Sequence, residues 1–284
     1  MGASGNVGSR VADRLLAEKK DVRVFGRSAE RLDGLARQGA EVLEGDAIRP
    51  DDLHTLFKGA ESAFVVLPDN VTDPQYVANR SAMSRAIAEA LRDEGVGHIV
   101  MASSLGAEHS AGVGQVVGLH ELEELLNGLD ANVLALRAAF HMENFLGSVP
   151  MIQQQKMNGS AVKAELKFPM VACMDIAECA AQRLLEPTFT GHTVETVLGP
   201  EDRTMTEATR ALGNALGMPD VPYVEFPPEG VKAALQGIGW SEEFASLLVE
   251  SQLAINEGRM TAGERTPENT TPTTLEEFLK TTLE

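Results

Sequence analysis

Cysteine is scarce in this sequence, and its scarcity removes two classes of site. Only two cysteines, Cys173 and Cys179, occur among 284 residues, and both fall around the start of one predicted helix. Their spacing matches neither a redox pair nor a zinc-binding pattern, so we interpret them as small, buried or half-buried side chains. The six histidines are scattered without ligand-like pairing, and we therefore predict no metal site.

Basic residues are also few. The chain has 24 lysines and arginines against 42 aspartates and glutamates, which gives a formal net charge of -18. This balance argues against direct binding of nucleic acid, because a protein that neutralises phosphates needs a basic surface. An anionic cofactor would need a local positive site, which helix N-termini and a few arginines could supply.

Long apolar runs are missing as well. No stretch reaches the length of about 18 apolar residues that a membrane-spanning helix needs, and no secretory signal opens the chain. We therefore expect a cytoplasmic protein with no membrane partner. The length of 284 residues indicates one large domain, or one domain with a smaller appendage. A homodimer is compatible with the sequence.

The first half of the chain shows a regular alternation of short apolar strands and helices. Strands are predicted at residues 22–25, 41–43, 62–67, 98–102 and 131–136. Helices are predicted directly after the glycine loop and at residues 29–37, 50–57, 74–94 and 119–126. This rhythm predicts an α/β fold of the Rossmann type, with a doubly wound parallel sheet over residues 1–137.

The alternation breaks after Arg137. Residues 138–284 are predicted to form a smaller, mostly helical, substrate-binding cap region that makes a single integrated unit with the first region. Helices are predicted at residues 175–185, 206–216, 228–257 (one or two helices) and 272–283.

A glycine-rich loop opens the chain as Gly2-Ala3-Ser4-Gly5-Asn6-Val7-Gly8. Glycines let the backbone turn tightly and approach a pyrophosphate, while the next helix directs its free N–H groups at the negative charge. Such a fingerprint should follow a strand, but only Met1 precedes Gly2. The first, central strand is therefore expected to be missing from the numbered chain, with a large loss of sheet stability.

The residues that follow the strand at 22–25, the second strand of a Rossmann pattern, indicate the preference between NAD and NADP. An NAD-type site usually has an acidic residue there, whereas this sequence has Gly26-Arg27-Ser28, with Arg31 one turn later. An arginine at this place can pair with a 2′-phosphate and stack on the adenine, so we predict NADP(H). The alternative is a pair of solvated surface arginines.

Polar residues end the later strands as well. Asp46 could accept a hydrogen bond from the adenine, or it could simply form a turn. Ser103 and Ser104 end a strand near the expected nicotinamide position, although strand-end turn serines would look the same. The predicted cofactor-binding residues are Gly2, Ser4, Gly5, Asn6, Val7, Arg27, Ser28, Arg31, Asp46, Ala47, Leu67, Pro68, Ser103 and Ser104.

The order of these motifs resembles the NmrA-like family of atypical short-chain dehydrogenases/reductases. The motifs that carry the resemblance are the glycine loop, Gly26-Arg27, Gly45-Asp46, residues 98–100, residues 103–106, residues 118–123, Leu136-Arg137, residues 140–146, residues 175–178 and residues 273–278. Ala138 stands where the family usually has proline. The resemblance implies a quinone oxidoreductase or a dye reductase, or alternatively a cofactor-sensing regulator that catalyses nothing.

Ordinary alcohol–ketone chemistry is disfavoured, because the Tyr-x-x-x-Lys pair of short-chain dehydrogenases is absent. Only two tyrosines occur; Arg80 stands four residues after Tyr76, and Pro227 four after Tyr223. No G-x-S-x-G motif of a serine hydrolase is present either. An electron-poor, planar acceptor that needs little proton help fits better.

Four residues are candidates for handling such an acceptor. His120 could shuttle a proton and Glu123, one helical turn later, could orient it, although a surface pair is equally consistent. Phe140 could stack on a planar substrate and Asn144 could hydrogen-bond it. The alternatives are core packing for Phe140 and a helix N-terminal role for Asn144 and Glu143.

Overall fold

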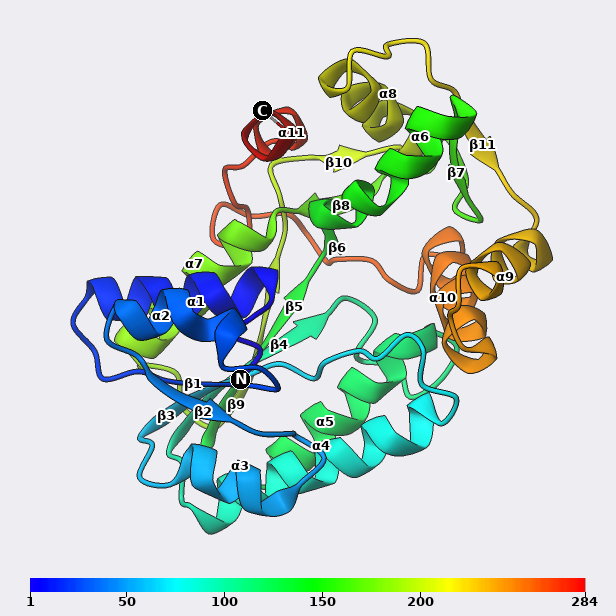
Figure 1. The fold of residues 1–284 in the computed structure, drawn as a ribbon. Coiled ribbons are helices and arrows are strands. Elements are labelled where there is room, and N and C mark those ends of the chain that lie inside the picture. Colours follow the sequence, from blue (N-terminus) through cyan, green and yellow to red (C-terminus); the bar gives the residue numbers. More distant parts are fainter. Residues whose placement is uncertain (284) are drawn as a thin grey trace.

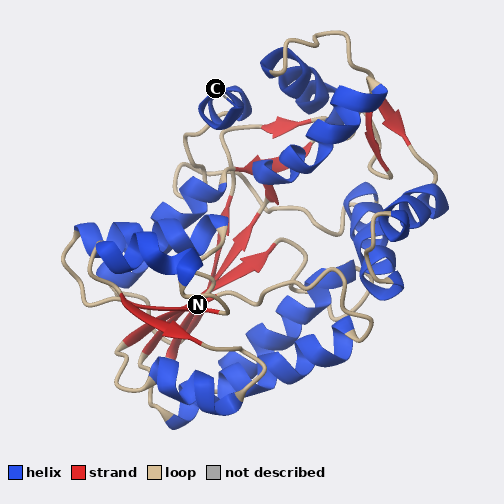
Figure 2. Ribbon diagram, in the orientation of Figure 1, coloured by secondary structure: helices blue, strands red, loops and turns tan. Residues whose placement is uncertain are grey.

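A parallel β-sheet forms the centre of the molecule in the computed structural model, which describes residues 1–283 (Figure 1). Its main part has the strand order β3-β4-β5-β9, and β1 and β2 form a separate parallel pair. Helices cover both faces, as Figure 2 shows, so the predicted Rossmann-type α/β fold is confirmed.

The elements have the following bounds. The strands are β1 (Arg23–Gly26), β2 (Glu41–Glu44), β3 (Ser62–Val65), β4 (His98–Ser104), β5 (Asn132–Ala138), β6 (Phe140–His141), β7 (Asn158–Ser160), β8 (Phe168–Val171), β9 (His192–Val197), β10 (Asp202–Arg203) and β11 (Tyr223–Glu225). The helices are α1 (Asn6–Ala17), α2 (Asp33–Arg37), α3 (Pro50–Phe57), α4 (Tyr76–Asp93), α5 (Val117–Asn127), α6 (Val149–Gln155), α7 (Cys173–Leu185), α8 (Met205–Ala215), α9 (Pro228–Gly237), α10 (Glu242–Asn256) and α11 (Leu275–Leu283). Short 3₁₀ segments are η1 (Glu30–Leu32), η2 (Gly114–Val116) and η3 (Met142–Ser148).

The two faces of the sheet have separate apolar cores. Ile99 and Val100 are successive residues of β4, and they point into different cores because side chains alternate along a strand. Ile99 packs in the core covered by α3, α4 and α5, where Leu122 is fully buried. Val100 packs in the core covered by α1 and α7, together with Ile176. This two-sided burial explains why the strand sequences are continuous apolar runs.

A gap divides the sheet between β1 and β3. Its cavity has a volume of about 770 Å³ and is lined by Val24 and Phe64, among other residues of the two strands. The amino group of Met1 donates a hydrogen bond to the carbonyl oxygen of Phe64 at 2.7 Å. Within residues 1–283, the first strand is β1, which follows α1.

Residues beyond Arg137 contribute to the sheet as well as to the cap region. Strand β9 pairs with β5, and α7 packs against α1, so both belong to the main layers. The rest of this region contains the small sheet β10-β8-β6 and the pair β11-β7, which the sequence analysis did not predict. Several of these strands have only two or three residues, too few for a periodic pattern to appear.

Membrane insertion can be checked on the helices directly. Among residues 1–283, no helix combines the length and the apolar character that a membrane crossing requires.

Candidate functional site

The glycine loop has a backbone that requires glycine at two positions. Gly2 adopts a positive φ of 69°, which residues with a side chain rarely do. A Cβ on Gly8 would lie 2.3 Å from the carbonyl oxygen of Gly2, so the first turn of α1 can approach the loop only with glycine there. The amide of Gly5 closes the loop by donating to the Gly2 oxygen at 2.9 Å.

The N-terminus of α1 has no internal acceptor for its free amides. Its N-cap residue is Gly5, no side chain caps the helix, and no acidic residue lies in the first turn. The amide groups of the first turn have no intrahelical partner, and the helix dipole is positive at this end. The loop and helix together therefore suit the pyrophosphate of a dinucleotide.

A cavity beside the glycine loop brings several predicted cofactor-binding residues together. Its volume is about 170 Å³, and its walls come from the glycine loop and from the segments that follow β1, β2 and β3. The predicted residues that line it are Gly2, Ser4, Arg27, Asp46, Ala47 and Pro68. The other predicted cofactor-binding residues do not line it: Gly5, Asn6, Val7, Ser28, Arg31, Leu67, Ser103 and Ser104.

The guanidinium of Arg27 is available to a ligand. Arg27 is exposed, follows β1 directly and lines the cavity. Within residues 1–283 it forms no ion pair and no hydrogen bond, and the same holds for Arg31. A cation at the edge of this cavity that lacks a protein partner fits the predicted 2′-phosphate contact, which stays a prediction.

Asp46 has a role within the protein. Its carboxylate accepts a hydrogen bond from the amide of Ile48 at 3.2 Å, which is the geometry of an aspartate turn. Its own amide donates to Asp52 at 2.8 Å. The turn interpretation therefore describes this structure, and one carboxylate oxygen of Asp46 is left for an adenine contact.

A buried arginine on the far wall of the cavity was not predicted. Arg80 forms an ion pair with Asp69 and a hydrogen bond with the hydroxyl of Tyr76, and all three residues line the cavity. Burial lowers the pKa of Arg80 and raises the pKa of Asp69. The Nε of Arg80 is buried and has no partner among the described residues. The Tyr76 hydroxyl therefore has a partner within α4, in Arg80 one helical turn later.

The carboxyl ends of β4 and β5 carry polar side chains that are already paired. Glu123, with only 5% of its surface exposed, accepts hydrogen bonds from Ser103 and from the guanidinium of Arg137. The closest Arg137–Glu123 contact is 2.6 Å, and this hydrogen bond raises the pKa of Arg137. The Ser104 hydroxyl donates to the carbonyl oxygen of Leu105. The serines predicted to face the nicotinamide thus already have acceptors within the protein.

His120 does not pair with Glu123 in the structure, and the predicted orienting role of Glu123 is wrong in this respect. The Nδ1 of His120 lies 2.9 Å from the carbonyl oxygen of Ala107 instead. That contact fixes a proton on Nδ1, because a carbonyl oxygen can only accept. The Nε2 atom of this half-buried ring has no partner within residues 1–283 and is the nitrogen left for proton exchange.

The predicted substrate-binding residues lie at the start of the cap region. Phe140 is half-buried and packs edge-on against Phe168 with ring centroids 5.6 Å apart, so core packing accounts for part of its surface. Asn144 is exposed in η3. Glu143 accepts a hydrogen bond from the amide of Cys173 at 3.0 Å and so caps α7. Burial raises the pKa of both the Cys173 and the Cys179 thiols, which disfavours the reactive thiolates.

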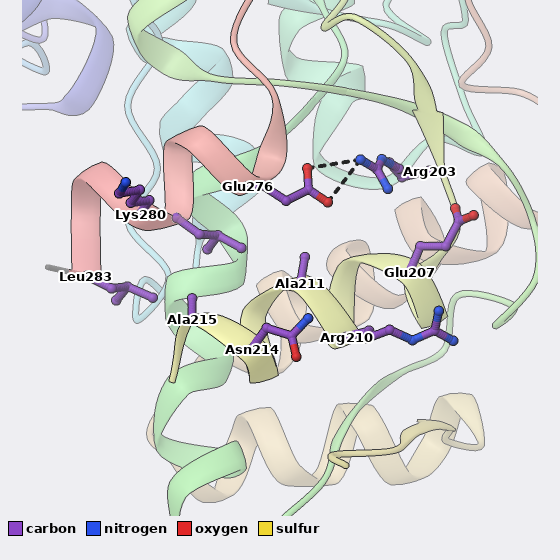
Figure 3. A pocket seen from close by; sticks show the side chains of 10 residues that line it. Arg203, Glu207, Arg210, Ala211, Asn214, Ala215, Glu276, Lys280 and Leu283 are labelled. Carbon is purple, nitrogen blue, oxygen red and sulfur yellow. Dashed lines mark hydrogen bonds and ion pairs between the residues drawn. The ribbon is translucent and has the colours of Figure 1, made fainter. Parts of the chain in front are cut away.

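A third cavity, of about 430 Å³, lies between α8 and α11 (Figure 3). Its walls include Arg203, whose Nη2 donates to both carboxylate oxygens of Glu276 in α11, at 3.0 and 2.9 Å. None of the predicted site residues lines this cavity. No group of residues in the described part of the chain could hold a metal ion.

The sheet, the glycine loop and the uncapped helix define a dinucleotide-binding protein of the Rossmann class. Residues 2–149 match the NAD(P)H-binding family, which is more than half of the chain. The chain belongs to the NAD(P)H-binding family.

Known proteins extend the comparison over nearly the whole chain. The NAD(P)H azoreductase of Xenophilus azovorans is 28% identical over 254 residues, which cover 88% of this chain and 84% of the relative. The NADPH complex of the quinone oxidoreductase QOR2 from Escherichia coli has a TM-score of 0.83 at 22% identity, covering 100% of this chain and 98% of the other. The negative transcriptional regulator NmrA in complex with NADP has a TM-score of 0.71 at 14% identity, covering 99% and 88% of the two chains. The expected cofactor-binding family is thus confirmed as NAD(P)H-binding, and the QOR2 and NmrA structures share the fold of this chain.

Proposed function

We propose that this protein is an NADPH-dependent oxidoreductase that transfers hydride to an electron-poor, planar acceptor such as a quinone or an azo dye. The observation that carries the proposal is Arg27, which has no ion-pair partner within residues 1–283 and shares one cavity with the glycine loop, beside the uncapped N-terminus of α1. The activities of two similar proteins, an azoreductase and a quinone oxidoreductase, support the class of acceptor.

The residues around the cavity fit the pyrophosphate, the 2′-phosphate and the adenine of NADP(H). The amides of Asn6 and Val7 would hold the pyrophosphate, and Arg27 with Arg31 would hold the 2′-phosphate. Asp46 and the neighbouring Ala47 would lie along the adenine. When bound, NADPH supplies the hydride, and the protein supplies its position relative to the acceptor.

We assign proton handling to His120, which lies outside the cavity beside the glycine loop and next to Ala107. Its Nδ1 proton is held by the Ala107 carbonyl oxygen, so Nε2 is the atom that takes up and gives up a proton. A quinone or an azo compound accepts hydride readily and needs only a proton from water or a histidine afterwards. The lack of a Tyr-x-x-x-Lys pair is therefore compatible with reduction of such acceptors and not with ordinary ketone reduction.

The experiment is NADPH oxidation measured against a panel of quinones and azo dyes, with NADPH binding measured separately by fluorescence. We expect turnover of at least one acceptor, and weaker NADPH binding in Arg27→Ala. Tight NADPH binding without turnover of any acceptor would contradict the catalytic proposal.

A second candidate is a non-catalytic protein that senses the redox state of NADP. The observation that favours it is the internal pairing of Ser103, Glu123 and Arg137, which leaves few free polar groups at the ends of β4 and β5. A sensor should bind NADP⁺ and NADPH with distinct affinities, or bind a partner only in one cofactor state. Equal calorimetric affinities, together with no partner in pull-down experiments, would argue against it.

A further inference from the structure

Glu44 places a negative charge beside the turn that carries Arg27. It is the last residue of β2 and the register partner of Gly26 at the end of β1. The amide of the next residue, Gly45, donates to the Gly26 carbonyl oxygen at 3.1 Å and locks the two strand ends together. Both Gly26 and Gly45 line the cavity beside the glycine loop, so Glu44 stands at its edge.

The carboxylate of Glu44 is bound to the backbone of this turn and not to an arginine. Its Oε2 accepts a hydrogen bond from the amide of Ala29 at 2.9 Å. Within residues 1–283, neither Arg27 nor Arg31 forms an ion pair with it. The turn that would receive a 2′-phosphate therefore already holds an anion that forms no ion pair within residues 1–283.

The two ionic groups of this turn favour different nucleotides. Arg27 attracts a 2′-phosphate, whereas Glu44 repels it and competes for the Ala29 amide. A nucleotide without the phosphate presents a ribose hydroxyl. In NAD-type sites this hydroxyl donates a hydrogen bond to a carboxylate at a strand end. In NAD-type sites the acidic residue follows the strand that corresponds to β1. In this chain Arg27 follows β1, and the acidic residue, Glu44, comes from the neighbouring strand β2.

We propose that Glu44 is a specificity-determining residue that lowers the preference for NADPH over NADH, so that the site accepts both nucleotides. This assignment rests on the proposed cofactor site. It goes beyond that proposal because it names a residue that opposes the role of Arg27.

The test is the dissociation constants of NADPH and NADH, measured by fluorescence for wild type, Glu44→Gln and Glu41→Gln. Glu41 lies at the other end of the same strand, where it pairs with Arg23 at 2.8 Å, and serves as the matched control. Removing one exposed charge near a phosphate should raise the NADPH preference about fivefold to tenfold at low salt. Glu41→Gln should leave the ratio within about twofold of wild type, since surface pairs contribute little. The difference should shrink at about 0.5 M salt, where exposed charges are screened.

Each outcome separates this proposal from the one it rests on. A Glu44→Gln protein that binds both nucleotides with an unchanged or lower NADPH preference overturns the Glu44 assignment alone. A wild-type protein that binds neither nucleotide overturns the cofactor site and the Glu44 assignment together. An increase that is equally large in Glu41→Gln also overturns it, because the effect would then not be local.

Discussion

Two parts of the sheet edge differ in how their polar side chains are bonded: the glycine-loop side and the β4–β5 side. On the glycine-loop side, made of the loop and the residues after β1 and β2, Arg27 is exposed and unpaired within residues 1–283. On the β4–β5 side, Ser103, Glu123 and Arg137 are bonded to one another and largely buried. Both sides carry strand-end polar residues that look equally functional in the sequence.

A free polar side chain can form a new bond with a ligand. A side chain that is already paired within the protein must first give up that bond. A ligand phosphate meets free donors on the glycine-loop side in Arg27 and the first-turn amides of α1, and only the Ala29 amide is already bonded, to Glu44. A ligand on the β4–β5 side must compete with a buried ion pair, and leaving one partner of such a pair alone is costly. We infer that the first side binds and that the second mainly holds strands β4 and β5 to α5.

The largest expected effect tests the structural role of the β4–β5 side. Glu123→Gln should lower the free energy of unfolding by about 3 kcal/mol, because the Arg137 guanidinium loses its buried counter-charge and keeps only the exposed Glu108 at 3.1 Å. For a chain of this size that corresponds to a fall in Tm of about 6–12 °C, measured by calorimetry. The neighbouring, exposed Glu124 provides the control, and Glu124→Gln should change stability by less than about 0.5 kcal/mol. An unaffected Tm in Glu123→Gln would remove the basis of the comparison.

Arg27→Ala should give the next largest effect, on the glycine-loop side. Loss of a charge-assisted contact should weaken NADPH binding about 30-fold while NADH binding changes less than about threefold. Stability should hardly change, since Arg27 contacts no other side chain through an ion pair within residues 1–283. Arg37→Ala, at the exposed end of α2, is the matched control. An equal loss for both nucleotides would refute the 2′-phosphate role.

Gly8→Ala should weaken both nucleotides to the same degree, by about tenfold. The added Cβ would meet the Gly2 carbonyl oxygen, and relieving that overlap pushes α1 away from the loop. Gly34→Ala is the control, because nothing lies within 4 Å of a Cβ there. Selective loss of NADPH alone would mean that the glycine loop does not hold the shared pyrophosphate.

The smallest effect is expected for His120, whose Nε2 has no partner within residues 1–283. His120→Gln should lower kcat about fivefold with a single good acceptor, since hydride transfer to an electron-poor acceptor needs little proton assistance. The dissociation constant of NADPH should stay unchanged. His109→Gln, two residues beyond Ala107, is the control. A loss of NADPH affinity in His120→Gln would place the ring in the cofactor site instead.

The sequence predicted the elements with long periodic patterns and missed those defined by distant contacts. Helix α3 was predicted with its observed bounds, because Pro50 suits the first turn and its apolar face is regular. The fold and the cofactor class followed from the glycine loop and the strand rhythm. The pairing of Glu123 with Ser103 and Arg137 depends on how α5 packs against β4 and β5, and spacing along one helix instead suggested His120.

Two further residues show the same limit. Arg80 looked like a failed lysine position four residues after Tyr76, but the fold supplies Asp69 as its ionic partner. Glu44 was not singled out in the sequence, and only the pairing of β1 with β2 places it beside Ala29. Contacts between residues many positions apart are set by strand register, which a single sequence specifies only through the whole fold.

Hydrogen–deuterium exchange with and without NADPH tests the central claim most directly, because it reports which backbone amides the cofactor protects. The account predicts strong protection of the glycine loop with the first turn of α1, and of residues 26–31 after β1. It predicts little change around Ser103 and Glu123, whose bonds exist before binding. Protection confined to the β4–β5 side, with the glycine loop unchanged, would contradict it.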